Sequence, residues 1–432
     1  MGDFIRVIGG GLAGCEAAYQ IAKRGIKVKL YEMKPKKFSP AHSNPNLAEI
    51  VCSNSLKSNS ITNACGLLKE ELRILDSLLI KIADKTAVPA GQALAVDREE
   101  FAKRITEELS KNPRIEIVHE ECKTIEENGI TIIATGPLTS DKMAEEISKI
   151  TGSCRLFFYD AVAPIIEKDS IDFSIAFYGD RYGKGESNYI NLPMNQREYQ
   201  NFYRELIQAE VVNLHGFEKN EIFESCMPIE IMAKRGEDTI RFGPLKPVGF
   251  VDPRTGERPY AIVQLRQDDT KDTLYNMVGF QTNLKFGEQK RVFSLIPGLK
   301  NAEFVKYGVM HRNTYINSPE LLEPTYQLKN RSNLFFAGQI TGVEGYVESI
   351  ASGLLAGINS VKQFKKEKKI IFPDTTMIGA LTKYITTPRK HFAPMNANFG
   401  ILPELEEKIK DKKVRYEELA KRALISLKRL VI

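Results

Sequence analysis

Several features that define other classes of protein are missing from this sequence of 432 residues. No apolar run reaches the roughly 20 residues that a helix needs to cross a bilayer. The first residues, MGDFIRVIGGG, lack the basic, apolar and small-residue regions of a secretory signal. The six cysteines form no CxxC pair, and the five histidines show no zinc-ligand spacing. We therefore expect a soluble, cytoplasmic protein without a disulfide framework or a metal site.

Length and charge leave the class of partner open. The chain exceeds the ~250–300 residues at which a single hydrophobic core stops growing, so we expect two domains or one domain with a large insertion. Hydrophobic residues make up 42% of the chain and charged residues 27%, as in ordinary globular proteins. The formal net charge of +6 permits a polyanionic partner without requiring one.

A dinucleotide-binding motif begins the chain. FIRVIGGGLAGCEAAYQIAKRGIKVKLYE is typical of a strand, a glycine turn, a helix and a second strand. Its GxGxxG glycines allow the tight turn, the approach of a pyrophosphate and close packing of the helix on the strand. The Glu32 carboxylate can accept a hydrogen bond from a ribose hydroxyl. The residues predicted to bind the cofactor here are Gly9, Gly10, Gly11, Leu12, Ala13, Gly14 and Glu32.

Two later segments indicate that the dinucleotide is FAD. GITIIATGP (129–137) predicts a buried strand that ends in a turn containing Gly136. The stretch 333–364 predicts a strand, then Gly338, Gly342 and Gly345, then a long helix. A fold that opens the chain and returns near its end is typical of two-domain FAD proteins. No second GxGxxG is present, so we expect NADH or NADPH to visit the flavin only transiently.

The intervening segment has a different character. It contains short alternating runs, SIAFYG, NYINLPM, TIRFGPL, YAIVQLR and LYNMVGFQTNL, and an amphipathic helix around QREYQNFYRELIQAEVV. The predicted fold class is therefore α/β, a Rossmann-like FAD-binding domain with an inserted α+β domain. We place the FAD-binding domain at 1–150 and 298–432 and the insertion at 151–297.

Two cysteines stand out as candidate reactive thiols. Cys52 lies in the polar run EIVCSNSLKS, and Cys226 precedes Met227 and Pro228, which favours an extended, exposed chain. The other four, Cys15, Cys65, Cys122 and Cys154, are interpreted as structural.

Most of the chain resembles one enzyme family. The blocks GGGLAGCEAAYQIAKRG, CSNSLKSN, VPAGQALAVDREEF, FESCMPIE, RFGPLKPVG, MHRNTYINSP, FAGQITGVEGYVES and MNANFGILP occur in family order between residues 9 and 403. Together they are similar to the folate- and FAD-dependent tRNA (uracil-5-)-methyltransferases, the short relatives of the GidA flavoproteins. Gln92 departs from the glycine expected there and lies outside the reactive blocks.

The resemblance implies chemistry for the two thiols. Uracil carbon 5 becomes nucleophilic when a thiolate adds to carbon 6, and it can then take a one-carbon unit from methylenetetrahydrofolate. The family implies Cys226 as the nucleophile and Cys52 as the acid/base, although the roles could be exchanged. Because the thiolate is the reactive form, cationic neighbours would help, and Lys57 and Arg235 are candidates by sequence proximity.

The resemblance also implies a folate site and an RNA substrate. His311 would stack a pterin ring, and Arg312 would meet the glutamate tail or an RNA phosphate. The basic stretches 362–369 and 408–429 offer phosphate contacts, although such stretches are also common on solvated helix faces. We expect the T-loop uridine of tRNA as the target. A ribosomal RNA uridine and a generic FAD-dependent oxidoreductase are the alternatives.

Overall fold

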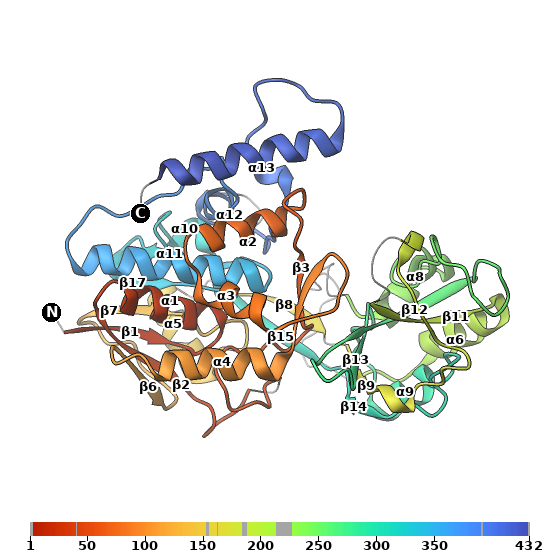
Figure 1. Ribbon diagram of the computed structural model, residues 1–432. Helices are drawn as coiled ribbons and strands as arrows, with labels where there is room; N and C mark the ends of the chain where they lie inside the picture. Colours follow the sequence, from red (N-terminus) through yellow and green to blue (C-terminus); the bar gives the residue numbers. More distant parts are fainter. Residues whose placement is uncertain are drawn as a thin grey trace.

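Two lobes of unequal size make up the structure (Figure 1). The computed structural model describes residues 3–39, 41–152, 155–161, 163–183, 188–212, 227–389 and 392–430, and of residues 155–161, 183, 311 and 312 it describes the backbone only. The larger lobe contains both ends of the described chain. The smaller one, here called the insertion lobe, runs from strand β9 to strand β14, residues 165–306, and lies at the right of Figure 1.

A six-stranded sheet forms the centre of the larger lobe. Its order is β16-β17-β7-β1-β2-β6, with every neighbouring pair parallel except β16 and β17. The strands are β1 (Phe4–Ile8), β2 (Lys27–Glu32), β6 (Ile115–His119), β7 (Ile130–Ile133), β16 (Gln327–Leu328) and β17 (Arg331–Phe336). The parallel strands from the two ends of the chain thus lie side by side, which confirms the predicted α/β, Rossmann-like class.

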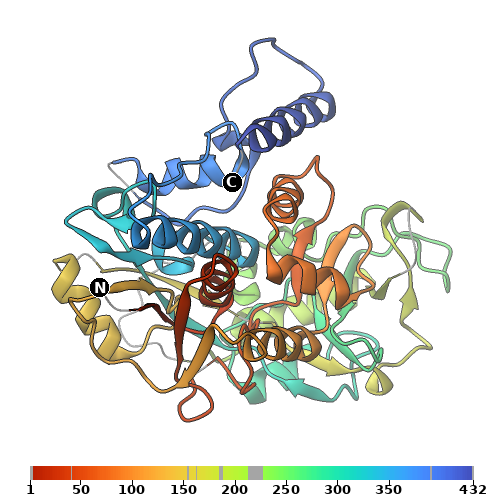
Figure 2. The ribbon, with the colours of Figure 1, turned by 60° about the vertical axis from the view of Figure 1, so that its left-hand side comes forward.

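Helices cover both faces of this sheet. Alternate residues of a strand point to opposite faces, and Val7 joins the core under helices α1 (Leu12–Lys23) and α11 (Tyr346–Phe364), whereas Ile8 joins the core under α5 (Asp141–Thr151). The remaining helices of the larger lobe are α2 (Ala64–Ile74), α3 (Leu78–Lys85), α4 (Arg98–Ser110), α10 (Ser318–Leu321), α12 (Met377–Thr386) and α13 (Lys412–Arg429). Figures 1 and 2 both show α13, with the loop before it, at the outer edge of the lobe.

The insertion lobe has an antiparallel sheet and its own hydrophobic core. The strand order is β10-β11-β12-β13-β9-β14, and the core residues run from Ala163 to Ala302. The strands are β9 (Ile165–Glu167), β10 (Phe177–Tyr178), β11 (Tyr189–Met194), β12 (Ala261–Gln267), β13 (Leu274–Met277) and β14 (Phe304–Lys306). The helices are α6 (Gln196–Gln208), α7 (Ile229–Ala233), α8 (Glu237–Phe242) and α9 (Phe286–Phe293).

Smaller elements lie between the lobes. Strands β8 (Arg155–Ala161) and β15 (Met310–Ile316) pair antiparallel and carry the chain out of the larger lobe and back. A three-stranded sheet, β3 (Ser55–Ser58), β5 (Ala93–Val96) and β4 (Ala87–Val88), lies on the larger lobe near the insertion lobe (Figure 1).

The sequence predicted most of these elements and was wrong on one of them. The amphipathic helix around residue 200 is α6, which Asn195 and Glu198 begin with a capping box. TIRFGPL, interpreted as a strand-like run, contains instead the last four residues of α8, which follows Gly236 and has Glu237 and Asp238 in its first turn. The predicted domain limits, 1–150 with 298–432 and 151–297, stay a prediction.

Candidate functional site

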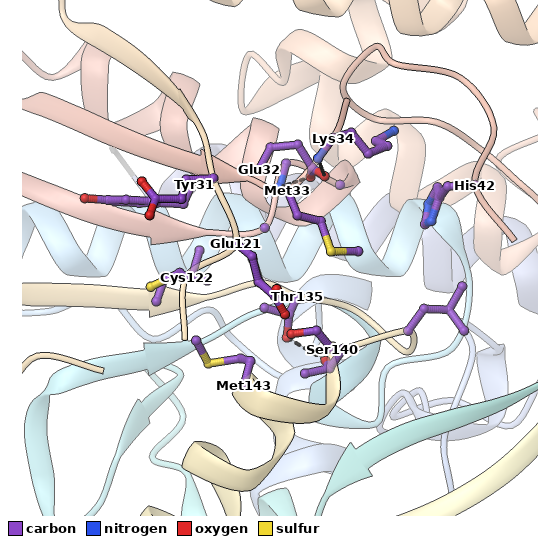
Figure 3. Close-up of a pocket in the computed structure, with 18 of the residues that line it drawn as sticks. Tyr31, Glu32, Met33, Lys34, His42, Glu121, Cys122, Thr135, Ser140 and Met143 are labelled. Atoms are coloured by element: carbon purple, nitrogen blue, oxygen red, sulfur yellow. Dashed lines mark hydrogen bonds between the residues drawn. The ribbon is translucent and has the colours of Figure 1, made fainter. Parts of the chain in front are cut away.

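A cleft lies at the carboxyl ends of the parallel strands, beside the turn between β1 and α1 (Figure 3). We call it the glycine-loop cleft. Its lining combines the turn, the end of β2, the segment after β6 and the segment after β7. The residues are Ile8, Gly9, Gly10, Gly11, Tyr31, Glu32, Met33, Lys34, His42, Glu49, Glu120, Glu121, Cys122, Ala134, Thr135, Leu138, Thr139, Ser140 and Met143. The predicted residues Gly9, Gly10, Gly11 and Glu32 therefore share one cleft.

The glycines of the turn differ in what surrounds them. Gly9 has a φ of +106°, and a Cβ built on it would lie 2.5 Å from the carbonyl oxygen of Ala134. A Cβ on Gly14 would lie 1.8 Å from the carbonyl oxygen of Gly9, so both positions need glycine for packing. A Cβ on Gly11 meets no heavy atom within 4 Å. The space before α1 is therefore open, as approach of a pyrophosphate requires.

Helix α1 offers its N-terminus to this space. Gly11 is the N-cap, no side chain accepts a hydrogen bond there, and the first turn contains no acidic residue. Free amides and the positive end of the helix dipole favour an anion. The Glu32 carboxylate is held nearby, because its Oε2 accepts from the Gly10 amide at 2.8 Å and its Oε1 from the Lys34 amide at 2.9 Å.

Several of the other predicted cofactor residues lie in packed parts of the structure. Leu12 and Ala13 are buried in the first turn of α1. Gly338 has a φ of +83°, and a Cβ there would approach the Ala13 Cβ at 3.0 Å. Gly342, with a φ of +84°, lies against the Phe392 ring, and Gly136, with a φ of +68°, follows β7 next to the cleft residue Thr135. Their contacts with a cofactor stay a prediction.

A second cleft lies between the two lobes and contains Cys52. We call it the Cys52 cleft. It is lined by Val51, Cys52, Ser53, Ser55, Leu56, Lys57, Cys65, Pro137, Leu138, Gln281, Asn313, Gln339, Glu344, Gly345, Tyr346, Val347 and Glu348. Gln281 comes from the insertion lobe, Asn313 from β15 and the last four residues from the start of α11 and its N-cap. Leu138 lines both clefts, so the two clefts are neighbours in the structure.

Two side chains hold the backbone of residues 50–53, here called the Cys52 loop. The Tyr346 hydroxyl accepts from the amides of Cys52 at 2.8 Å and Ser53 at 3.2 Å, and burial raises the pKa of Tyr346. The Arg98 guanidinium donates to the carbonyl oxygens of Ile50 and Val51, both at 3.2 Å. Because the loop forms no strand or helix, these contacts replace the hydrogen bonds of a sheet.

Lys57 lies in the same cleft. Its Nζ is 3.7 Å from Oε1 of Glu348, and its backbone has a φ of +62°. The buried Lys69 stabilises this conformation by donating to the carbonyl oxygens of Leu56 at 2.6 Å and Ser58 at 2.8 Å. Lys57, which the sequence suggested as a cation near Cys52, therefore lines the same cleft as Cys52.

Two buried polar atoms of the cleft residues have no hydrogen-bond partner among the described residues. They are the amide Nδ2 of Asn313 and the carboxylate Oε2 of Glu348. One is a donor and the other an acceptor, and an unpaired buried polar atom is costly.

Part of the predicted site lies outside the described residues. Cys226 and Cys154 are outside them, and of His311 and Arg312 only the backbone, in β15, is described. Met227, the next described residue after Cys226, is buried. The Ile229 amide donates to the carbonyl oxygen of Gln281 at 2.7 Å. Since Gln281 lines the Cys52 cleft, the residues that follow Cys226 lie near that cleft. Arg235 is an exposed residue after α7.

The remaining described cysteines differ in burial. Cys15 and Cys65 are buried, and burial raises the pKa of Cys65 to about 12 and that of Cys15 further, so both stay protonated thiols. Cys122 is half-buried at the edge of the glycine-loop cleft, and burial raises its pKa as well.

Sequence reasoning missed the residues that hold the Cys52 loop. Tyr346 and Arg98 are far from Cys52 in sequence and belong to no local motif that names a partner.

The helices of the described part of the chain include none with the length and apolar character of a membrane span. Among the same residues, no group of three or more His, Cys, Asp or Glu side chains could hold a metal ion.

Comparisons with known proteins identify the family of this chain. The model of the family "Glucose inhibited division protein A" matches residues 4–368. The protein called methylenetetrahydrofolate--tRNA-(uracil-5-)-methyltransferase TrmFO in Listeria monocytogenes is 60% identical over 427 residues, which cover 99% of this chain and 98% of the relative. A relative of the same name in Acetivibrio thermocellus is 59% identical over 430 residues, 99% of each chain.

A solved structure shares the fold. Aquifex aeolicus GidA superimposes with a TM-score of 0.71 at 17% identity, over 99% of this chain and 73% of that one. At this identity the likeness concerns the fold alone.

Proposed function

Because this chain belongs to the methylenetetrahydrofolate–tRNA-(uracil-5-)-methyltransferases of the GidA family, we propose that it methylates carbon 5 of a uridine in tRNA. Methylenetetrahydrofolate is the one-carbon donor and FAD the bound cofactor. The observation that carries the proposal is that a glycine turn with an uncapped helix N-terminus and the loop bearing Cys52 line two neighbouring clefts that share Leu138.

The residues present fit FAD. The open space before Gly11 and the uncapped α1 N-terminus would take the pyrophosphate, and Glu32 lies where a ribose would bind. The flavin ring would then extend past Leu138 toward Gly345 and Tyr346. When bound there, FAD supplies the redox chemistry and carries the one-carbon unit.

The two thiols act on the uracil ring. The Cys226 thiolate adds to carbon 6, which pushes an electron pair to carbon 5 and makes that carbon a nucleophile. After carbon 5 has taken up the one-carbon unit, the Cys52 thiolate removes the proton of carbon 5, and the bond between the one-carbon unit and its carrier breaks to leave an exocyclic methylene. A hydride derived from NADH or NADPH then reduces this methylene to methyl, and departure of Cys226 restores the double bond. The opposite assignment of the two cysteines is chemically equivalent. Lys57 lies in the same cleft as Cys52.

Electron balance calls for a reductant. The methylene unit is two electrons more oxidised than the methyl group of the product, and tetrahydrofolate leaves unoxidised. We propose NADH or NADPH as the source of these electrons, with a transient visit to the cleft. His311 as a pterin-stacking residue, Arg312 and the basic stretches as RNA contacts, and a cytoplasmic location stay predictions.

The substrate is tested with RNA that lacks the modification. The protein, loaded with FAD, is incubated with methylenetetrahydrofolate, NADH or NADPH and either unmodified tRNA or ribosomal RNA, and 5-methyluridine is measured by nucleoside mass spectrometry. The proposal expects the product in tRNA, at the T loop. Product in ribosomal RNA alone would move the activity to that target, and no product in either RNA would refute it.

A further inference from the structure

The insertion lobe forms hydrogen bonds with the loop that contains Cys52. Arg266, near the end of β12, donates from Nη2 to Oγ of Ser53 at 2.6 Å and from Nε to Oδ1 of Asn54 at 3.0 Å. Asn54 in turn donates from Nδ2 to the carbonyl oxygen of Gln267 at 2.8 Å. The two residues that follow Cys52 are thus bonded to two successive residues of the other lobe.

A second set of contacts lies on the other side of Cys52. Arg98, which donates to the carbonyl oxygens of Ile50 and Val51, also donates from Nε to the buried Asp268 at 3.0 Å. Asp97, the N-cap of α4, accepts from the Thr270 amide at 3.0 Å and from its hydroxyl at 2.7 Å. The turn after β12 is therefore fixed to the larger lobe on both sides of the loop.

Arg266 is an unusual residue in this position. Its side chain is buried, and its hydrogen-bond partners across the lobe boundary are the neutral Ser53 and Asn54. Burial of a guanidinium is costly, and burial lowers the pKa of Arg266. The negative charge of Asp268 offsets part of this cost, and the rigid fork of arginine fixes two acceptors at defined angles.

We infer that Arg266 is a positioning residue for Cys52, so that the insertion lobe sets the place of this thiol in the cleft. The inference rests on the proposed function for its catalytic consequence only. Arg266 acts through Ser53 and Asn54, while Tyr346 holds the amides of Cys52 and Ser53 from the larger lobe. The thiol is then placed correctly only when both lobes form these hydrogen bonds with the loop.

The test compares Arg266→Lys, Ser53→Ala and the double variant. Lysine keeps the charge but cannot hold both acceptors, and Ser53→Ala removes one acceptor alone. We expect kcat for tRNA methylation to fall about 10- to 100-fold in each variant, because small misplacements of a reacting group have effects of this size. FAD content and KM for tRNA should stay as in the wild type. The double variant should be no slower than Arg266→Lys, since both changes break the same contact.

A readout independent of methylation separates this inference from the proposed function. The rate at which iodoacetamide modifies Cys52 is followed by peptide mass spectrometry, with the half-buried Cys122 in the same sample as the internal standard. Arg254→Lys is the control variant, because Arg254 lies in the same lobe and bonds to Asp252 two residues away. We expect the modification rate of Cys52 to change severalfold in Arg266→Lys and Ser53→Ala and to stay constant in the control. An unchanged rate for Cys52 in both variants would overturn the inference, even if the wild-type protein proved to have another substrate.

Discussion

Replacement of Gly11 by valine tests the cofactor site with little damage to the fold. Gly11 has a φ of −77° and a ψ of −170°, an extended conformation that valine adopts readily. Its Cβ would enter space with no heavy atom within 4 Å. The new side chain therefore stands where a pyrophosphate would approach the α1 amides, while the packing of β1, α1 and β2 is left intact.

The magnitude follows from the hydrogen bonds that valine would block. A hydrogen bond between an amide and a charged group contributes about 1.5–3 kcal/mol, so the loss of two weakens binding by roughly 3–6 kcal/mol. At about 1.4 kcal/mol per tenfold change, the Kd for FAD rises roughly 10²- to 10⁴-fold. The loss of a glycine N-cap costs about 1 kcal/mol of stability, which lowers the melting temperature of the cofactor-free protein by about 4 °C or less.

Two measurements decide this prediction. Flavin content is read from the absorbance of the purified protein, and FAD titration of the stripped protein gives Kd. Gly287→Val is the matched control, because Gly287 in the insertion lobe also has open space around its Cβ and lies far from the turn in sequence. A folded Gly11→Val protein that binds FAD as tightly as the control would refute the placement of the pyrophosphate.

Three further predictions concern other parts of the molecule. Cys52→Ala and Cys226→Ala should each abolish methylation with FAD retained, and the double variant should be no worse because the thiols act as a unit; wild-type turnover in either single variant would contradict this. Tyr346→Phe leaves the amides of Cys52 and Ser53 without their acceptor, so kcat should fall and flavin content persist; an unchanged kcat would show that the hydroxyl is dispensable. Burial raises the pKa of Glu71 from 4.5 to about 7, so the native state binds the proton more tightly and the free energy of unfolding falls as pH rises between these values. Relative to Glu71→Gln, the free energy of unfolding of the wild type should fall by on the order of 3 kcal/mol between pH 4.5 and pH 7. If urea unfolding gives the same difference in stability between the two proteins at pH 5 and at pH 8, the shift is contradicted.

The sequence predicted the glycine turn well because its determinants are local. Gly9, Gly14 and Glu32 lie within one strand–helix–strand unit, and the spacing of the motif already contains the reason for each glycine. The long helix that follows Gly345 was predicted for the same reason, since strand, glycines and apolar helix are consecutive in the chain.

The surroundings of Cys52 could not be predicted in this way. Its amide bonds to Tyr346, 294 residues away, and the neighbouring Ser53 bonds to Arg266, 213 residues away. No pattern in a single sequence pairs an arginine at the end of a strand with a serine in another lobe. The error at TIRFGPL has a similar origin, because its apolar alternation is compatible with a strand while the helix is favoured by Gly236 and two acidic residues upstream.

The origin of the transferred carbon tests the central claim most directly. The protein, loaded with FAD, is given unmodified tRNA, NADH or NADPH and methylenetetrahydrofolate labelled with ¹³C in the methylene group, and the nucleosides are analysed by mass spectrometry. The account predicts ¹³C in the methyl group of 5-methyluridine, no label when the reductant is omitted, and no label in a Cys226→Ala protein with full flavin content. 5-Methyluridine that forms without ¹³C, or labelled product at the wild-type rate from the Cys226→Ala protein, would contradict it.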